Sequence, residues 1–421
     1  MPSEPTKVTI RMFNVGFGDC FLLTFHYARP IKDQSILIDF GSVGGKADMK
    51  GIAADIKEAC GGKLYAVVAT HRHKDHISGF SNAGGKESAG AIIASCKPEV
   101  VLQPWTENPD AAANATSAPL LAKQRKAGNK QLYFASLSAM NAVAEAVVRQ
   151  AARWRGVSST PGMLEKLAAN AVKNPDAVKN LRTMGKKPAR FLQYGSKSGL
   201  ESKLLPGVKI HVLGPPTLEQ QNLKKYAKNS DEYWLASKYW GLQERAVALA
   251  GGSDLFPREK RYEKKSRPFH TRWFSQHADA ALKSSTLAIV TVLDSFLNNT
   301  SLILLFEVKG KKLLFPGDAQ WENWSWALSQ KGVQDLLKDV DVYKVGHHGS
   351  RNATPKTLWN LFSKRKGKQL HTMMSTAAGV YGRTAEGKVP APRLVKDLND
   401  QSDLLNTQKL RTKRGPLQLD V

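Results

Sequence analysis

The sequence predicts a mixed α/β protein of the α+β type, with two sheet-forming halves separated by long insertions. Short apolar runs rich in Val, Ile, Leu and Phe recur in residues 8–105 and 285–395, as expected of buried strands. Segments with helical spacing of apolar residues follow these runs in both halves. Residues 110–204 and 217–284 are more basic, and we expect them to be insertions.

The first half alternates like a sheet and then turns helical. Ile52, Ile56 and Ala59 have the spacing of one helix face, and the glycines at 61–62 supply a stop. A second, short helix is expected over residues 89–96. The expected strands of this half are residues 8–14, 21–25, 35–39, 64–70 and 100–103.

The first insertion, residues 110–204, reads as helical and basic. Helices are expected over residues 132–154 and 160–174. Residues 149–197 contain 11 Lys and Arg against two acidic residues. Residues 217–284 form the second insertion, which is also basic.

The second half returns to a sheet pattern, with one helix expected over residues 321–328. The basic tail after residue 395 shows no clear core pattern. We expect residues 1–421 to form one domain, with its core at about 8–105, 205–216 and 285–395. The expected strands are residues 208–213, 288–293, 302–306, 311–315 and 340–345.

The composition indicates a soluble, cytoplasmic protein. An apolar fraction of 42% supports a sizeable core and is not typical of a disordered chain. No apolar run approaches the roughly 20 residues that cross a bilayer, so no membrane association is expected. Cys20, Cys60 and Cys96 form no CxxC pair, and we expect them to be small reduced core residues.

The charge predicts a polyanionic partner. Sixty-two Lys and Arg against 36 Asp and Glu give a net charge of +26. Such a field attracts polyanions, with nucleic acid as the first candidate. Solubility alone is the alternative, although a smaller charge suffices for it. No protein partner is predicted.

The strongest chemical signal is a loop rich in metal ligands, which reads His-Arg-His-Lys-Asp-His from residue 71. Imidazole and carboxylate groups hold divalent zinc, manganese or iron. On an extended segment His71 and His73 project to the same side, whereas Asp75 and His76 can enter a helical turn and face a second centre. One loop thus supplies two adjacent metals. The alternative is a polar surface loop.

Two further pieces follow strands in the second half. Asp318 follows a glycine at the end of one strand, and His347-His348-Gly349-Ser350 follows the next. A Gly-Asp turn alone is weak evidence, but the ordered set of three segments is specific.

This set resembles the metallo-β-lactamase superfamily, and more narrowly the soluble hydrolase domain of ComEC-type competence proteins. Asn14-Val-Gly-Phe-Gly-Asp19, Ile36-Leu-Ile-Asp39, Asn298-Asn-Thr-Ser301 and Phe315-Pro-Gly-Asp318 carry the narrower resemblance. The resemblance implies a four-layer αββα sandwich, here with helical and basic insertions. It also places two divalent metal ions, Zn or Mn, at one edge between the sheets.

The resemblance also implies roles for the first ligands. His71 and His73 would bind metal one, and Asp75 and His76 would bind metal two. Asp318 would bridge the two ions. Asp75 is also expected to take part in catalysis.

The remaining roles fall on residues around these ligands. His347 would complete metal two, and Asp39 would orient the histidine loop without ligating. His348 could protonate a leaving oxygen or position a phosphate. Ser350 and Arg383 are candidate substrate contacts, although a turn role and a surface role are the alternatives.

The sequence departs from the family at two places. A further histidine for metal one is missing, which leaves three alternatives for that ion: it lacks a protein ligand, it binds weakly, or it uses Gln103 or Glu107. His211 lies mid-strand, where a core or surface imidazole is expected. The family's Tyr-Gly-His-Pro is Tyr-Gly-Arg-Thr here, at 381–384. Arg72 and Lys74 are expected to face solvent.

Three functions follow. The first is a nuclease or phosphodiesterase that acts on nucleic acid through a hydroxide activated by the metal pair, as two-metal sites do. The second is a hydrolase of a small molecule, such as a nucleotide or an ester. The third is a non-catalytic nucleic-acid-binding subunit, which the missing histidine motivates.

Overall fold

We describe the fold from a computed structural model of the chain. The structure describes residues 4–44, 47–108, 174–201, 203–217, 297–364, 367, 370–377, 379–380, 388–410 and 415–421. The helix expected over 132–154, the helix expected over 160–174 except its last residue, the strand expected over 288–293 and nearly all of the second insertion lie outside these residues.

A first sheet of seven strands has the order β13-β1-β2-β3-β4-β5-β6. Its pairs are antiparallel from β13 to β3 and parallel from β3 to β6. The strands are β1 (Lys7–Phe13), β2 (Cys20–His26), β3 (Gln34–Phe40), β4 (Ala66–Val68), β5 (Val100–Pro104), β6 (Arg190–Leu192) and β13 (Pro416–Asp420).

A second sheet of six strands has the order β12-β11-β10-β9-β8-β7. It is parallel from β12 to β9 and antiparallel from β9 to β7. The strands are β7 (Val208–Gly214), β8 (Ile303–Val308), β9 (Lys311–Phe315), β10 (Val342–Lys344), β11 (His371–Met374) and β12 (Asp403–Asn406). Both sheets are therefore mixed, as in an α+β protein.

A shared apolar core lies between the two sheets, and it is formed by every second side chain of their strands. In β2, Phe21 and Leu23 belong to this core, whereas Leu22 faces the opposite side. In β8, Leu304 belongs to the same shared core and Leu305 faces the opposite side. Because successive side chains of a strand point to opposite faces, an unbroken apolar run buries both faces of each sheet.

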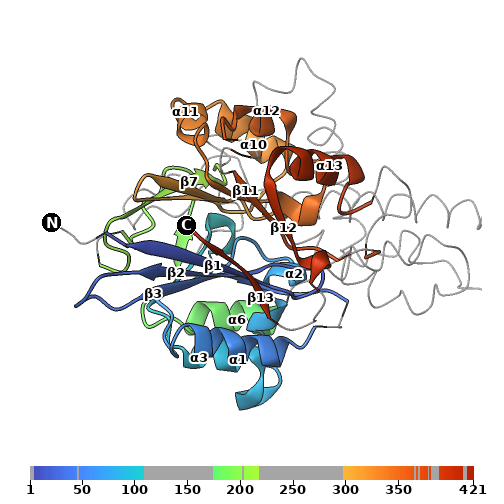
Figure 1. The fold of residues 1–421 in the computed structure, drawn as a ribbon. Helices are drawn as coiled ribbons and strands as arrows, with labels where there is room; N and C mark the ends of the chain where they lie inside the picture. The colour runs from blue at the N-terminus through green and yellow to red at the C-terminus, as the bar shows by residue number, and fades with distance from the viewer. Residues whose placement is uncertain are drawn as a thin grey trace, which may run out of the picture.

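Helices cover the outer faces of the two sheets (Figure 1). One group packs on the first sheet, and the other packs on the second. The first group is α1 (Met49–Ala59), α3 (Ala89–Ser95) and α6 (Pro175–Thr183). The second group is α10 (Trp321–Leu328), α11 (Val333–Leu337), α12 (Lys356–Leu361) and α13 (Pro392–Gln401).

Shorter elements complete the described fold. The one-turn helix α2 (Lys74–Ile77) follows β4. Tight 3₁₀ turns occupy Ser78–Phe80, Gly85–Glu87, Trp105–Glu107, Gly346–Gly349 and Thr407–Lys409. Within the described part of the chain, no helix has the length and apolar character needed to cross a membrane.

The expected elements of both halves are confirmed wherever the structure describes them. The helix expected over 321–328 is α10. The helix around Ile52 is α1, which begins at an N-cap Asp48 that accepts from the Gly51 N–H and ends before Gly61. Elements with a clear apolar period were therefore predictable within a few residues.

Two boundaries differ from the expectation. The end of the first insertion belongs to the core, because β6 pairs with β5 and α6 buries Ala177 and Leu181 under the first sheet. The tail also contributes, since β12 extends the second sheet and β13 pairs with β1. Their side chains are only half-buried, so these edge strands show little apolar period.

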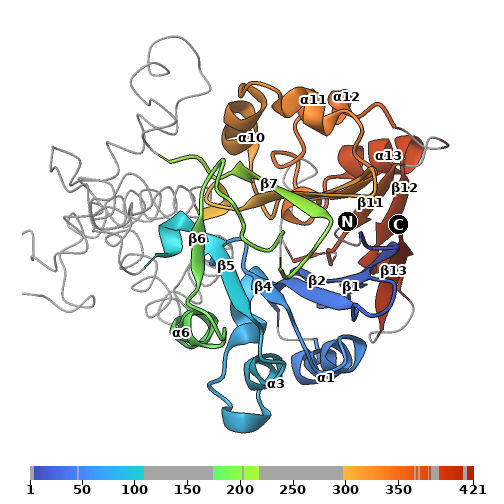
Figure 2. The ribbon, with the colours of Figure 1, turned by 90° about the vertical axis from the view of Figure 1, so that its left-hand side faces the viewer.

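The topology brings the ends of four parallel strands together. β3 and β4 are parallel neighbours in the first sheet, and β9 and β10 are parallel neighbours in the second. The carboxyl ends of parallel strands share one edge of a sheet, which is where open α/β sheets place their ligands. In Figure 2 the second sheet lies directly over the first.

We expect Leu304→Ala to lower the free energy of unfolding by about 2–5 kcal/mol, because it opens a cavity in the core that both sheets share. Urea unfolding followed by tryptophan fluorescence measures this loss. Leu336→Ala, at a half-buried position of α11, is the matched control and should cost less. Equal losses in the two variants would argue against a shared core between the sheets.

Candidate metal centre

Backbone and side-chain contacts of Thr70 fix the histidine loop at the end of β4. Its N–H donates to Asp39 Oδ1 at 2.7 Å, and its hydroxyl donates to Asp39 Oδ2 at 2.6 Å. Its carbonyl accepts from the Leu302 N–H of the second sheet at 2.9 Å. The loop is therefore held by both sheets before any ligand binds.

Two glycines allow the segments to approach this closely. At Gly41, a Cβ would lie 2.4 Å from the backbone nitrogen of His76. At Gly317, where φ is +55°, a Cβ would lie 2.8 Å from the side chain of Thr70. A larger residue at Gly317 would therefore meet both backbone strain and a clash. The Gly-Asp turn needs its glycine to deliver Asp318 next to the histidine loop.

His76 lies between two carboxylates. Its Nδ1 donates to Asp39 Oδ2 at 2.8 Å, and its Nε2 lies 3.0 Å from Asp318 Oδ2. Asp39 accepts hydrogen bonds through both oxygens, so it acts as a carboxylate that fixes the ring orientation. This leaves Nε2 directed at Asp318, as a metal ligand would be.

His348 is fully buried in the same cluster. Its Nε2 lies 3.2 Å from Asp75 Oδ2 and 3.5 Å from Asp318 Oδ2, and its Nδ1 donates to the carbonyl of Ser375 at 3.1 Å. The ring of Phe17 covers it at a centroid distance of 4.3 Å. Both ring nitrogens are thus engaged inside the protein, and neither is open to a substrate.

His71 and His73 form the other side of the cluster. The Thr70 hydroxyl lies 3.2 Å from His71 Nδ1, and Asn298 Oδ1 lies 3.0 Å from His73 Nδ1. An Nδ1–H on each ring can donate to these oxygens, which leaves the Nε2 of each ring with a lone pair. His71 Nε2 lies 3.0 Å from His73 Nδ1. The two rings therefore converge on one region.

The sequence analysis missed two charged members of the cluster. Asp19 and Lys344 are both buried, and their side chains form an ion pair. Lys344 Nζ also lies 3.3 Å from Asp318 Oδ1 and donates to the Gly317 carbonyl at 2.8 Å. The available signal for Lys344 was a lysine within an apolar strand, three residues before the first of the paired histidines.

The cluster carries more negative than positive charge. The four buried carboxylates are Asp19, Asp39, Asp75 and Asp318. Lys344 supplies one permanent positive charge, so three negative charges remain if the imidazoles are neutral. Buried charges that lack compensation are costly. Divalent cations or protonated imidazoles must therefore balance this cluster.

The ligand atoms form overlapping groups within 4.8 Å of one another. His71, His73 and Asp75 form one group, and Asp75 also belongs to the second. The second group is Asp75, His76, Asp318 and His348; a third comprises Asp19, Asp39 and His76. Buried His/Asp clusters of this kind fit divalent metal ions of the zinc or manganese type.

Buried ligand atoms without a hydrogen bond support this fit. Within the described residues, His76 Nε2 and Asp318 Oδ2 face each other at 3.0 Å and have no other hydrogen-bond partner. His347 Nδ1 is likewise buried without one. Native interiors rarely leave such atoms unsatisfied, and a metal ion satisfies them.

The imidazoles fall into two electrostatic classes. Burial lowers the pKa of His71 well below its usual range and lowers that of His73 to about 4. Burial also opposes charge on His76 and His348, but Asp318 and neighbouring carboxylates outweigh it. The pKa of His76 is thus raised, and that of His348 is raised to about 10. Without metal, protons on these rings balance part of the negative charge.

Most of the expected ligands converge. His71, His73, Asp75, His76 and Asp318 all belong to the groups above. Asp39 contacts the histidine loop as the resemblance implied, through Thr70 and His76. The residue common to the first two groups is Asp75. Asp318 had been expected to bridge the two ions instead.

The two adjacent histidines, His347 and His348, differ from their expected roles. His348 joins the ligand groups, whereas His347, expected as a ligand of metal two, lies outside all three. Both have positive φ, 46° for His347 and 53° for His348, so the turn after β10 is left-handed. This turn directs His348 inward and leaves His347 partly exposed. The backbone N–H of His347 donates to Asp318 Oδ1 at 3.1 Å. A sequence pattern does not reveal such a turn.

The alternatives for metal one also have defined places. Glu107 engages Arg72 through both oxygens, at 2.8 and 2.9 Å, so its carboxylate is already committed. The expectation that Arg72 faces solvent is wrong, because the buried carboxylate of Glu107 holds its guanidinium group. Lys74, for which the same was expected, is half-buried. Gln103 is buried at the end of β5 and stays a prediction.

The remaining candidates lie away from the ligand groups or outside the described residues. His211 lies 3.2 Å from Glu307 on the neighbouring strand and belongs to no ligand group. The hydroxyl of Ser350 donates to Asn352 at 2.8 Å, and its N–H donates to the His347 carbonyl. These contacts are those of a turn. Arg383 lies outside the described residues.

Comparison with known proteins adds no assignment: no protein-family model and no curated protein matches this sequence. The interpretation of the cluster therefore rests on its own geometry and chemistry.

Asp39→Asn should weaken metal binding by about 10–100-fold, the usual cost of losing a partner that orients a ligand. The amide cannot accept from the Thr70 hydroxyl, the Thr70 N–H and His76 Nδ1 as the carboxylate does. Competition with a chromophoric chelator measures the affinity. Asp33→Asn, which alters an exposed partner of His26, is the control. An unchanged affinity in Asp39→Asn would contradict the orienting role.

Metal binding should release protons and strengthen as the pH rises. The pKa of His348 is raised to about 10, so at pH 7 a metal ion has to displace its proton, and the same holds for His76. Protons compete with the metal, which makes the affinity fall as the pH falls. Calorimetric titration in two buffers with different ionisation enthalpies measures the release. His371→Gln should leave it unchanged, and metal uptake without proton release would contradict the assignment.

Proposed function

We propose that this protein is a metal-dependent phosphodiesterase that cleaves nucleic acid. The observation that carries the proposal is the buried group of carboxylates and imidazoles where the parallel strands of both sheets end. We also propose that the fold is the αββα sandwich of the metallo-β-lactamase superfamily. The core shared by two mixed sheets and the helices on both outer faces support this (Figure 1).

The two ligand groups suggest two adjacent ions. His71 and His73 would hold one ion, with Asp75 shared between the ions. His76, Asp318 and His348 would hold the other. Divalent ions such as Zn²⁺ or Mn²⁺, when bound, supply Lewis acidity and lower the pKa of a coordinated water.

The surrounding residues keep the histidine loop oriented and Asp318 ionised. Asp39 and Thr70 hold the histidine loop through short hydrogen bonds. The ammonium group of Lys344 contacts Asp318, and together with the buried imidazoles it holds the pKa of this carboxyl well below its usual range against the effect of burial. A carboxylate that stays ionised is the form that binds a cation.

His347 is the imidazole best placed to exchange a proton with a substrate. It is partly exposed, whereas His348 is fully buried. Burial lowers its pKa, so its ring is neutral near pH 7 and can take up a proton. We therefore propose that the partly exposed ring of His347 moves the proton at the reacting oxygens, the role that the sequence suggested for His348.

The net charge favours a polyanionic substrate. The fold alone does not fix the substrate, since unrelated reactions occur on one fold. A charge of +26 attracts the phosphate backbone and makes binding fall as salt rises. The basic residues of 149–173 and 258–272 lie outside the described part of the structure, so this argument rests on composition.

The test is cleavage of labelled single- and double-stranded DNA and RNA with added Mn²⁺ or Zn²⁺. We expect metal-dependent cleavage of at least one polynucleotide. Asp318→Asn should lower the rate by more than the about 10–100-fold that loss of an orienting partner costs, because it removes a ligand charge. The matched control is Asp335→Asn, at an exposed carboxylate of α11, which should retain the activity.

Other outcomes would replace the proposal. Hydrolysis of a small diester such as bis(p-nitrophenyl) phosphate, without binding or cleavage of polynucleotides, would indicate a small-molecule hydrolase. Salt-sensitive binding of nucleic acid without cleavage by any metal form of the folded protein would indicate a non-catalytic subunit. In either case the phosphodiesterase proposal for nucleic acid would be wrong.

A further inference from the structure

Two of the three cysteines end neighbouring helices on the outer face of the first sheet. Cys60 is the C-terminal cap of α1, and Cys96 is the C-terminal cap of α3. The Cys60 N–H donates to the Ile56 carbonyl at 3.0 Å, and the Cys96 N–H donates to the Ile93 carbonyl at 3.0 Å. Two helices that pack together, α1 and α3, thus both end in a cysteine cap.

The thiols of this pair interact with each other, and each also donates within its own helix, Cys60 Sγ to the Lys57 carbonyl at 3.4 Å and Cys96 Sγ to the Ile92 carbonyl at 3.6 Å. A side-chain hydrogen bond joins Cys60 and Cys96, although 35 residues separate them in the sequence. The chain turns sharply after Cys60, where the Lys63 N–H donates to the Cys60 carbonyl. The next residue, Leu64, lies beside Cys96, because its N–H donates to the Cys96 carbonyl. A disulfide requires side chains that already meet, and this packing supplies that condition.

The two sulfurs are not equivalent. The hydrogen bond from Cys96 lowers the pKa of Cys60 against the effect of burial, and the N–H groups of Lys63 and Gly62 contribute. The same hydrogen bond and burial raise the pKa of Cys96. Gly61 and Gly62, with φ of 59° and 72°, form the turn that brings these N–H groups close to the Cys60 side chain, while they donate to the Lys57 and Cys60 carbonyls. Cys60 is thus the more nucleophilic member of the pair.

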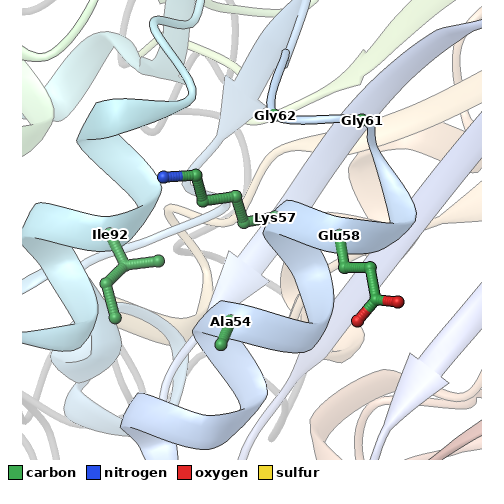
Figure 3. A pocket seen from close by; sticks show the side chains of 6 residues that line it. All are labelled: Ala54, Lys57, Glu58, Gly61, Gly62 and Ile92. Atoms are coloured by element: carbon green, nitrogen blue, oxygen red, sulfur yellow. The ribbon is translucent and has the colours of Figure 1, made fainter.

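Access also distinguishes the two cysteines. Cys60 is partly exposed, and Cys96 is buried. A pocket of about 500 Å³ opens beside Cys60, between α1 and α3, and is lined by Ala54, Lys57, Glu58, Gly61, Gly62 and Ile92. Figure 3 shows Lys57 extending from α1 toward α3, whereas Glu58 points away. A small oxidant can reach Cys60 because this residue is partly exposed.

We propose that Cys60 and Cys96 form an oxidation site, at which a hydroperoxide converts the thiol pair into an intramolecular disulfide. The Cys60 sulfur attacks the O–O bond, takes one oxygen as a sulfenic acid, and releases the other oxygen as water or an alcohol. The Cys96 sulfur then attacks the Cys60 sulfur, and the hydroxyl group leaves with the Cys96 proton as water. Two thiols are oxidised and one hydroperoxide is reduced.

The position of this pair connects it to the rest of the fold. The bond would close the chain between Cys60 and Cys96 into a loop that contains β4, α2 and the histidine segment at 71–76. Closing a loop restricts the unfolded chain more than the folded one. The oxidised protein should therefore melt at a higher temperature than the reduced protein, and a dithiol reductant should reverse the shift.

The experiment treats the full-length protein with hydrogen peroxide, blocks remaining thiols by alkylation after unfolding, and measures intact mass and peptide maps. We expect the loss of two of the three alkylatable thiols and a peptide that links Cys60 to Cys96. Cys20 is fully buried and should stay alkylatable as the internal control. In Cys96→Ser, dimedone should trap a sulfenic acid on Cys60.

Matched variants decide the outcome. Cys20→Ser should form the bond as the natural chain does, whereas Cys60→Ser should not, and circular dichroism establishes that each variant is folded. Retention of all three thiols, while an exposed cysteine peptide in the same tube is oxidised, would overturn the proposal. So would a bond between two molecules that forms equally in Cys96→Ser. The result is independent of the phosphodiesterase proposal, since neither cysteine belongs to the ligand groups.

Discussion

The constraint on which the rest of this structure depends is the burial of four carboxylates in one cluster with a single lysine. Charges removed from water in this way are unfavourable unless cations or donors balance them. Lys344 balances one charge by contacting Asp19 and Asp318. The remaining negative charge raises the pKa of His76 and His348, and it fits the charge of bound divalent ions. The same residues would thus hold protons in the absence of metal and metal ions at higher pH, so acidity and metal binding are coupled.

The two sheets are what make such a cluster possible. No single strand in the described part of the chain carries enough ligands, but the parallel strands β3 and β4 of one sheet and β9 and β10 of the other end at the same place. The apolar core between the sheets fixes their separation, and Gly41 and Gly317 allow backbone contact where any larger residue would clash. The apolar packing of the sheets therefore holds charged groups together that would otherwise repel each other.

The cluster and the thiol pair lie in different parts of the fold but share one segment. The histidine loop belongs to the chain between Cys60 and Cys96, which α1 and α3 anchor at both ends. Hydrolysis at the cluster requires no redox chemistry, and thiol oxidation requires no metal. Each can therefore be examined separately, while a covalent link between the helices would act on the chain that supplies four of the ligands.

The sequence by itself determined most strands and helices of the described fold, together with His71, His73, Asp75, His76 and Asp318, because strong apolar periods and closely spaced ligand types are local properties. Only the tertiary structure placed the edge strands β12 and β13 and the helix α6, whose pairing partners are far away in the sequence. It also showed that a left-handed turn places His348, and not His347, among the ligand groups. Asp19 and Lys344 likewise belong to the cluster only through tertiary contacts. Which side chains meet depends on backbone handedness and on contacts between distant segments, and a local pattern contains neither.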